Sequence, residues 1–386
     1  MKFQRYFQQV GCKLKMKWKL CLKKFPDVSL QIDIVIIVTT LVVCGLLLGD
    51  TFYDHSASTE INPVGKYELN DGFKYLPKTC DKLFAPSFNE NLQVIKNYPR
   101  GDADRYLSKI GGNKTRPDKM ASFPVFVTAM DFRYYPYSQG MFSSLHSVLE
   151  ADKNKGKSRL IVYDLGLSER QLKVLRQKCK CEIRRFPFEI FPPHVRKLKT
   201  YAFKPLIVQM TLLEFGFVWW IDISVKLINI NLDGAINYAK NNSMLFFVER
   251  SYPRRLSIAK QTDIRTFNYL AEDICKYRSF GEVWATTVVF HYDHITKAVV
   301  NAWASCALNE ACIAPVGEDK LNCDFLDISD GRCHRFDQSV LGIIFRRLYH
   351  EQNEYPLDKK LNNIYLIKRR EIVNYFERCR FESACY

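Results

Sequence analysis

Between residues 122 and 224, short apolar segments alternate with segments of helical spacing, and this alternation constrains the fold most. The apolar segments span 124–131, 159–166, 181–188 and 215–221, and the helical segments span 138–153, 168–179 and 201–216. Strands that alternate with helices form a mostly parallel sheet covered by helices. We therefore predict an α/β fold, with Ser168 as a helix N-cap and Gly216 as a helix end.

The last of these strands runs directly into a carboxylate. Residues 215–224 read FGFVWWIDIS, so a run of apolar and aromatic residues ends at Asp222 and is followed closely by Ser224. A strand of this composition is buried on both faces, and a charge at its end is costly unless a cation or a hydrogen-bond network holds it. Because ligands of α/β proteins bind at the carboxyl ends of the strands, Asp222 is the first candidate site residue.

A second constraint lies near the N-terminus. Residues 34–49 are apolar and uncharged, and the preceding 33 residues contain eight lysines and arginines against two aspartates. With its flanks this segment reaches the length of a membrane span. The basic flank predicts a cytoplasmic tail (1–33), a signal anchor (34–53), a luminal stem (54–121) and a luminal domain (122–386). A cleaved signal peptide and a buried core element are the alternatives.

The cysteines agree with a luminal domain. Three of the 13 lie in the tail and the anchor (Cys12, Cys21 and Cys44), and ten follow the anchor. In an oxidising compartment an even number predicts disulfides, although the pairing does not follow from sequence. The spacing Cys179-Lys180-Cys181 is not that of a zinc site. Asn113 and Asn241 begin glycosylation sequons on the same side of the anchor.

Two segments carry a resemblance to a known class of proteins. WWIDISVKL is similar to the segment of GT-A fold glycosyltransferases in which an apolar strand ends in Asp-x-Asp, and CHRFDQSVLGIIF (333–345) resembles their late helix start. VYDLGLSERQLKVL resembles the second β-α unit of several animal transferases, and the domain resembles the uncharacterised animal family known as domain of unknown function 1647. The resemblance covers about residues 122–345. It implies a GT-A-like sheet with helices on both faces and a nucleotide-sugar donor.

The resemblance also implies roles for individual residues. Asp222 is expected to bind Mn²⁺ or Mg²⁺ together with the donor, but Ser224 replaces the second aspartate of the motif, which weakens the expectation of a metal. Lys204 is expected to face the diphosphate and Asp131 the nucleoside. Asp337 is the candidate catalytic carboxylate. The alternatives are a turn residue at Asp222 and Asp131, a solvated face at Lys204 and an N-cap at Asp337.

Together these features predict a single-pass membrane protein of the Golgi or endoplasmic reticulum. It would transfer a sugar from a nucleotide sugar to a glycan or glycoprotein, with residues 34–53 in contact with membrane lipid. Two alternatives come from other classes: a catalytically inactive lectin-like or scaffold protein on the same fold, and a nucleic-acid-binding protein. The net charge of +16 favours the latter, but the basic residues beside the apolar segment indicate a membrane flank, so we expect no nucleic acid partner.

Overall fold

The computed structural model describes residues 80–151, 156–157, 159–248, 256–315, 323–324, 326–351, 364–380 and 384–385. The chain divides into two compact units, Met1–Asn70 and Asp71–Tyr386, and all described residues belong to the second. None of the helices within these ranges has the length and apolarity of a membrane span. The predicted tail and anchor lie outside the described residues.

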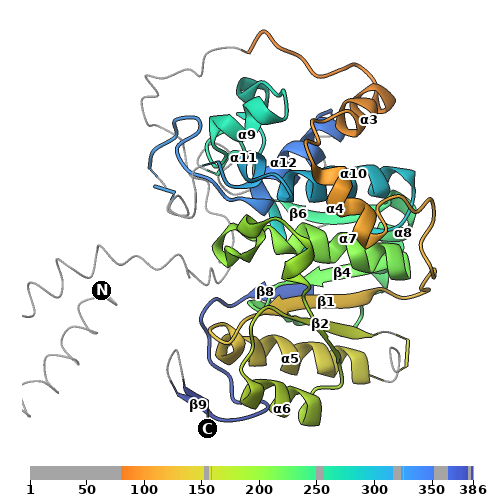
Figure 1. Cartoon of the computed structure of the whole chain (residues 1–386), viewed down its shortest axis with the longest axis vertical. Coiled ribbons are helices and arrows are strands. Elements are labelled where there is room, and N and C mark those ends of the chain that lie inside the picture. Colours follow the sequence, from red (N-terminus) through yellow and green to blue (C-terminus); the bar gives the residue numbers. More distant parts are fainter. Residues whose placement is uncertain are drawn as a thin grey trace, which may run out of the picture. The chain divides into compact units, whose positions relative to one another are not determined.

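Helices, strands and 3₁₀ turns alternate along the described chain (Figure 1). The α-helices are α3 (Phe88–Lys96), α4 (Ala103–Leu107), α5 (Tyr135–Glu150), α6 (Glu169–Lys178), α7 (Phe203–Phe215), α8 (Asp233–Asn242), α9 (Ile264–Tyr269), α10 (His294–Ala307), α11 (Glu310–Ile313) and α12 (Asp337–Leu348). The strands are β1 (Val125–Met130), β2 (Leu160–Asp164), β3 (Glu182–Arg185), β4 (Phe217–Ile221), β5 (Val225–Leu227), β6 (Met244–Val248), β7 (Val283–His291), β8 (Tyr365–Ile367), β9 (Cys379–Arg380) and β10 (Ala384–Cys385).

The main sheet has six strands in the order β3-β2-β1-β4-β7-β6. The four strands predicted from the sequence pair in parallel, which confirms the α/β class. Strand β7 runs antiparallel to both of its neighbours, so the sheet is mixed rather than parallel throughout. The chain moves outward from β1 to β3 and then returns to β4. Because such crossovers are right-handed, α5 and α6 lie on one face and α7 on the other.

Local signals fix the helices that surround the site. Ser168 caps α6 as predicted, in a capping box with Gln171. Helix α7 ends at Gly216, which adopts a φ of 68° that side chains with a Cβ rarely take. Helix α5 begins at Tyr135, three residues before the predicted start, because Asp131 accepts hydrogen bonds from the backbone just before it.

Described residues of the predicted stem pack against the helices around the sheet. Helix α3 contacts α10 and α12, and Tyr98 donates a hydrogen bond of 2.6 Å to the buried Glu272. Cys80 forms a disulfide with Cys275. Residues 80–121 therefore belong to the same compact unit as the sheet, and the boundary at residue 122 stays a prediction.

Two small sheets lie outside the main one. Strands β5 and β8 pair antiparallel, with Val225 opposite Ile367, although more than 130 residues separate them. Strands β9 and β10 form a hairpin closed by the disulfide Cys379–Cys385. The pairing of β5 with β8 brings the C-terminal segment beside the end of β4, and this contact shapes the site described next.

Candidate functional site

A pocket of about 390 Å³ opens where β1 and β4 end. It brings together the five residues that the sequence predicted for the donor and for catalysis: Asp131, Lys204, Asp222, Ser224 and Asp337. The other lining residues are Ala129, Met130, Tyr134, Tyr137, Leu165, Leu198, Tyr201, Phe203, Trp220, Ile223, Thr286, Arg335, Gln338, Arg369 and Arg370. The pocket lies at the carboxyl edge of the parallel strands, where α/β proteins bind ligands.

Asp222 follows β4, all of whose residues are buried. Its Oδ1 accepts a hydrogen bond of 2.7 Å from Trp220 Nε1 and lies 3.2 Å from Lys204 Nζ. These partners hold the charge at the end of a buried strand. The side chain keeps 24% of its surface exposed, and it faces the pocket instead of capping the turn after β4.

Lys204 is buried in the first turn of α7, not on a solvated face. Its Nζ lies 2.8 Å from Asp337 Oδ2, close to Asp222 as well, and donates to the carbonyl of Ala285 at 3.1 Å. Burial alone would lower the pKa of this ammonium, but the charges of Asp222 and Asp337 outweigh burial and raise the pKa above its usual value. Lys204 therefore carries its charge throughout the physiological range.

Asp337 is the first residue of α12, and Phe336 takes the N-cap position, so the N-cap alternative is wrong by one residue. The Asp337 side chain is 5% exposed. Burial raises the pKa of its carboxyl group, and the charge of Lys204 opposes that rise. The carboxylate thus depends on Lys204 for its charge balance.

Asp131 combines a turn role with a place in the pocket. Its Oδ1 accepts from the backbone N–H groups of Arg133 and Tyr134, and its Oδ2 lies 2.6 Å from the Arg133 guanidinium. Ser224 is held through its backbone: its carbonyl accepts a hydrogen bond of 2.7 Å from the N–H of Lys368. This bond anchors the residues that follow β8 at the rim of the pocket.

Three arginines line the pocket that the sequence reasoning did not select. Arg335 precedes α12, and Arg369 and Arg370 follow β8. The run Lys368-Arg369-Arg370 directly after an apolar segment was the available signal. Only the pairing of β8 with β5 brings this run to the site, and that pairing is not visible in local sequence.

Three buried polar atoms of lining residues have no hydrogen-bond partner within the described part of the chain. One is Asp337 Oδ2, which is ion-paired with Lys204, and the other two are Thr286 Oγ1 and Gln338 Nε2. Unsatisfied buried polar atoms are rare in folded proteins, and a bound ligand is one of the explanations for them. Thr286 and Gln338 therefore mark this pocket as a place where a polar ligand would supply hydrogen bonds.

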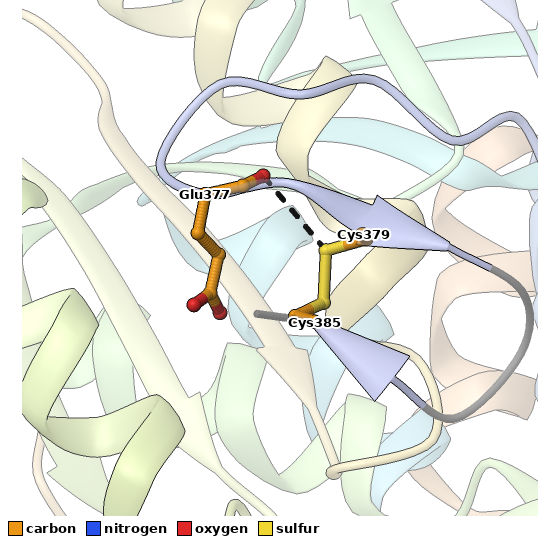
Figure 2. A group of neighbouring side chains, drawn as sticks. All are labelled: Glu377, Cys379 and Cys385. Atoms are coloured by element: carbon orange, nitrogen blue, oxygen red, sulfur yellow. Dashed lines mark hydrogen bonds between the residues drawn. A yellow bond between two sulfur atoms is a disulfide. The ribbon is translucent and has the colours of Figure 1, made fainter.

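The pocket does not offer the donor set of a divalent cation. Asp131 and Asp337 are each paired with a basic side chain, and Asp222 shares Oδ1 with Lys204 and Trp220. Among described residues, the group of three close metal-ligand types is Glu377, Cys379 and Cys385, and it lies outside the pocket. Figure 2 shows that its two sulfur atoms are bonded to each other, so neither is a thiolate that could bind a metal.

The two predicted glycosylation sites lie apart from the pocket. Asn113 is exposed in a turn, and Asn241 is exposed in the last turn of α8. Exposure is what modification of a folded domain requires, and their use stays a prediction. All ten cysteines after residue 53 are paired, as Cys80–Cys275, Cys179–Cys181, Cys306–Cys312, Cys323–Cys333 and Cys379–Cys385.

Fold and site together describe an α/β protein with a charged pocket at the carboxyl edge of a mixed sheet. Residues 111–209 match the family described as "Protein of unknown function (DUF1647)", which confirms for this segment the family resemblance expected from the sequence. The segment includes Asp131 and Lys204. No curated protein matches the chain.

Solved structures of glycosyltransferases are similar to the chain. The galactosyltransferase LgtC, in complex with donor and acceptor sugar analogues, is 13% identical, with a TM-score of 0.37 over 64% of this chain and 87% of LgtC. Core-mannan synthase A from Aspergillus fumigatus, in a form with Mn and GDP, is 10% identical, with a TM-score of 0.32 over 60% and 73%. Mouse xyloside xylosyltransferase 1 is 13% identical, with a TM-score of 0.34 over 59% and 82%.

Proposed function

We propose that this pocket binds a nucleotide sugar and that the protein transfers the sugar to a glycan or protein acceptor in the secretory pathway. The observation that carries the proposal is the convergence of five residues, predicted from separate parts of the sequence, on one pocket at the carboxyl edge of the sheet. Basic side chains and acidic side chains meet there, as transfer from an anionic donor to a hydroxyl group requires.

In the proposed reaction, an acceptor hydroxyl oxygen forms a bond to the anomeric carbon of the donor sugar. The bond from that carbon to the diphosphate oxygen breaks, and its electron pair stays on the diphosphate. The hydroxyl proton leaves to a base. Asp222 is the more accessible of the two carboxylates beside Lys204, with 24% of its side chain exposed against 5% for Asp337. A base must reach the hydroxyl group, so in this proposal Asp222 takes the proton. Asp337, which the resemblance suggested for catalysis, is instead a positioning residue that holds Lys204.

The test is a screen of nucleotide sugars with the purified full-length chain, run with Mn²⁺ and with EDTA. We expect hydrolysis or transfer with at least one donor. Asp222→Asn keeps the volume but removes the charge, and we expect it to slow the reaction by about 10²–10³-fold, the effect of one strong electrostatic contact. Ser224→Ala should slow it less, because it removes a neutral oxygen. An Asp222→Asn variant that folds normally and reacts at the parental rate contradicts the role of this carboxylate.

A catalytically inactive protein on the same fold is the second candidate, and Ser224 in place of a second aspartate favours it. Heat denaturation distinguishes the two. A donor that binds the folded state raises the midpoint of unfolding. If no nucleotide sugar raises the unfolding midpoint, with or without Mn²⁺, the result favours the catalytically inactive protein over the enzyme.

The compartment is part of the proposal. Five disulfides and two exposed sequons, at Asn113 and Asn241, support a luminal domain behind an anchor at 34–53. We expect enzymatic deglycosylation to shift the mobility of the expressed protein, and the double Asn→Gln variant to lose this shift. Protease protection that places the C-terminal domain on the cytosolic side of microsomes would contradict the topology.

A further inference from the structure

Arg335 and Arg369 face the same pocket from segments far apart in the chain. Arg335 is half-buried in front of α12, and Arg369 is exposed at the rim, after β8. Within the described residues, no carboxylate lies within ion-pair distance of either guanidinium, whereas Arg133, Lys204 and Lys226 each have an acidic partner. Two cations without an acidic partner in one pocket call for an anion that the described residues do not supply.

The electrostatics of Arg369 agree with this geometry. Although Arg369 is exposed at the rim, partial removal from water lowers the pKa of its guanidinium, and the positive charge of Arg335 lowers it further, while Asp222 opposes both effects. Like charges held close together destabilise each other. An anion placed between them removes that repulsion, and two guanidinium groups offer the paired N–H donors that bind phosphate oxygens best.

The surroundings of Arg335 add further donors. Gln338 is buried, lines the pocket, and its Nε2 has no partner among the described residues. Asp337 and Gln338 also form the first turn of α12, a helix of 12 residues. A helix N-terminus carries partial positive charge and favours anions. The anion-binding side of the pocket thus combines a guanidinium, an unsatisfied amide and a helix end.

Lys204, a residue of the pocket itself, already balances the charge of the carboxylates on the acidic side of the pocket. Lys204 Nζ lies between Asp222 and Asp337, at 3.2 and 2.8 Å. A cation bound at the Oδ1 atom of Asp222 would have to share this atom with Lys204 and Trp220. Because the fold holds the positive charge of Lys204 beside both carboxylates, these carboxylates attract a metal ion only weakly.

We propose that Arg335 and Arg369 bind the diphosphate of the donor directly, and that Lys204 takes the place of a divalent cation beside Asp222. This inference rests on the proposed function, because it assumes that the donor is a nucleotide sugar. Negative charge grows on the leaving diphosphate oxygen as the bond to the sugar breaks, and the guanidinium groups stabilise that charge without transferring a proton. Donor binding and transfer then need no divalent cation.

The test measures binding of inorganic pyrophosphate to the full-length chain in detergent, by titration calorimetry in EDTA. We expect binding in EDTA that Mn²⁺ or Mg²⁺ does not strengthen. Arg335→Gln and Arg369→Gln should each weaken it about tenfold or more, the effect of losing one charge-assisted hydrogen bond. Arg176→Gln is the matched control, because Arg176 is exposed on α6, away from the pocket, and carries the same charge. Thermal unfolding of each variant checks folding.

Three outcomes overturn the inference. The first is pyrophosphate binding that requires Mn²⁺, which would mean that the site uses a metal. The second is equal weakening by Arg176→Gln, which would show non-specific attraction to a basic surface. The third is no binding under any condition, which would mean that the pocket has no anion site. The proposed function fails separately. Pyrophosphate binding in EDTA without reaction of any nucleotide sugar would support the arginine site and contradict the transferase function. Mn²⁺-dependent transfer would support the transferase function and contradict the arginine site.

Discussion

At the scale of single residues, one ammonium group balances two carboxylates in the pocket wall. We expect Lys204→Met, which keeps most of the length of the side chain, to lower the free energy of unfolding by about 3–5 kcal/mol, because it leaves the buried Asp337 and the adjacent Asp222 without their cation. Urea denaturation measures this loss. Lys197→Met is the control, since Lys197 and its partner Glu310 are both about half exposed and such pairs contribute about 0–1 kcal/mol. Equal losses of stability in the two variants would mean that the ion pairs of Lys204 with Asp222 and Asp337 stabilise the fold no more than an exposed pair does.

The same variant should change how stability depends on pH. In the folded parent the pKa of Asp337 is already raised by burial, and Lys204 opposes that rise. Without Lys204 the pKa should rise further, so the folded state binds a proton more tightly than the unfolded chain does. Its stability is then greatest at low pH and is lost as pH rises through the raised pKa.

We therefore expect Lys204→Met, relative to the parent, to gain stability as the pH falls from about 7 to about 5. The double variant Lys204→Met/Asp337→Asn should lose this extra pH dependence, because the buried carboxyl group of Asp337 is no longer present to titrate. Urea denaturation at several pH values measures both. If the double variant keeps the slope, another group is responsible.

The site was only partly predictable at this scale, for physical reasons. Asp222 ends a strand whose residues are all apolar, so its position followed from local pattern. The burial of Lys204 also had a local signal, because the sequence of α7 is mostly apolar and a helix that is apolar all round leaves no solvated face for a lysine. In the structure, 11 of the 13 residues of α7 are buried. The basic run that contains Arg369 was visible in the sequence, but its place in the pocket depends on the pairing of β8 with β5, which a short window does not contain.

At the scale of elements, a buried ionic network attaches the N-terminal helices to the sheet domain. The side chain of Glu272 is fully buried. Its two carboxylate oxygens accept hydrogen bonds of 2.6 Å from the Arg347 guanidinium, and one of them also accepts a hydrogen bond of 2.6 Å from the Tyr98 hydroxyl group. The ammonium group of Lys276 lies 3.0 Å from the same carboxylate. Tyr98 follows α3, Arg347 belongs to α12, and Glu272 with Lys276 lies between α9 and β7. One carboxylate therefore connects three parts of the fold.

We expect Glu272→Gln to lower the free energy of unfolding by about 3–5 kcal/mol, because two buried cations lose their counter-charge. Glu310→Gln is the matched control at the surface, with an expected change within about 1 kcal/mol. Urea denaturation compares the two variants. A Glu272→Gln variant as stable as the control would show that water or a neighbouring group replaces the carboxylate.

The direction of β7 marks the limit of prediction for elements. Its residues 283–291 are apolar enough to be recognised as a strand. An apolar run contains no information about whether it pairs parallel or antiparallel. That choice depends on the path of the chain through β6, which precedes β7 in sequence and pairs with it at the edge of the sheet.

At the scale of the whole molecule, the five disulfides differ in how far apart in sequence they join the chain. Cys80–Cys275 spans 195 residues, whereas Cys179–Cys181 spans two. In the chain-entropy description, a disulfide that closes a long loop stabilises by about 4–5 kcal/mol and one that closes a very short loop by about 1–2 kcal/mol. The number of cysteines was readable from sequence, but their pairing needed the fold.

We therefore expect the double variant Cys80→Ser/Cys275→Ser to lose more stability than Cys179→Ser/Cys181→Ser. Urea denaturation of both, made in a secretory host, gives the comparison. Peptide mapping without reduction should find the five bridges that the structure shows. Recovery of most of these cysteines as free thiols would contradict both the pairing and the luminal compartment.

The anchoring of residues 364–369 beside Ser224 also sets an order of events during synthesis. A ribosome makes Asp131, Lys204 and Asp222 early, and the sheet that holds them can form while translation continues. Arg369 emerges only after about 145 further residues, and Lys368 must then bond to the waiting carbonyl of Ser224. The sheet can thus form before the pocket is complete, and the pocket that we propose to bind an anion is complete only after Arg369 has been made.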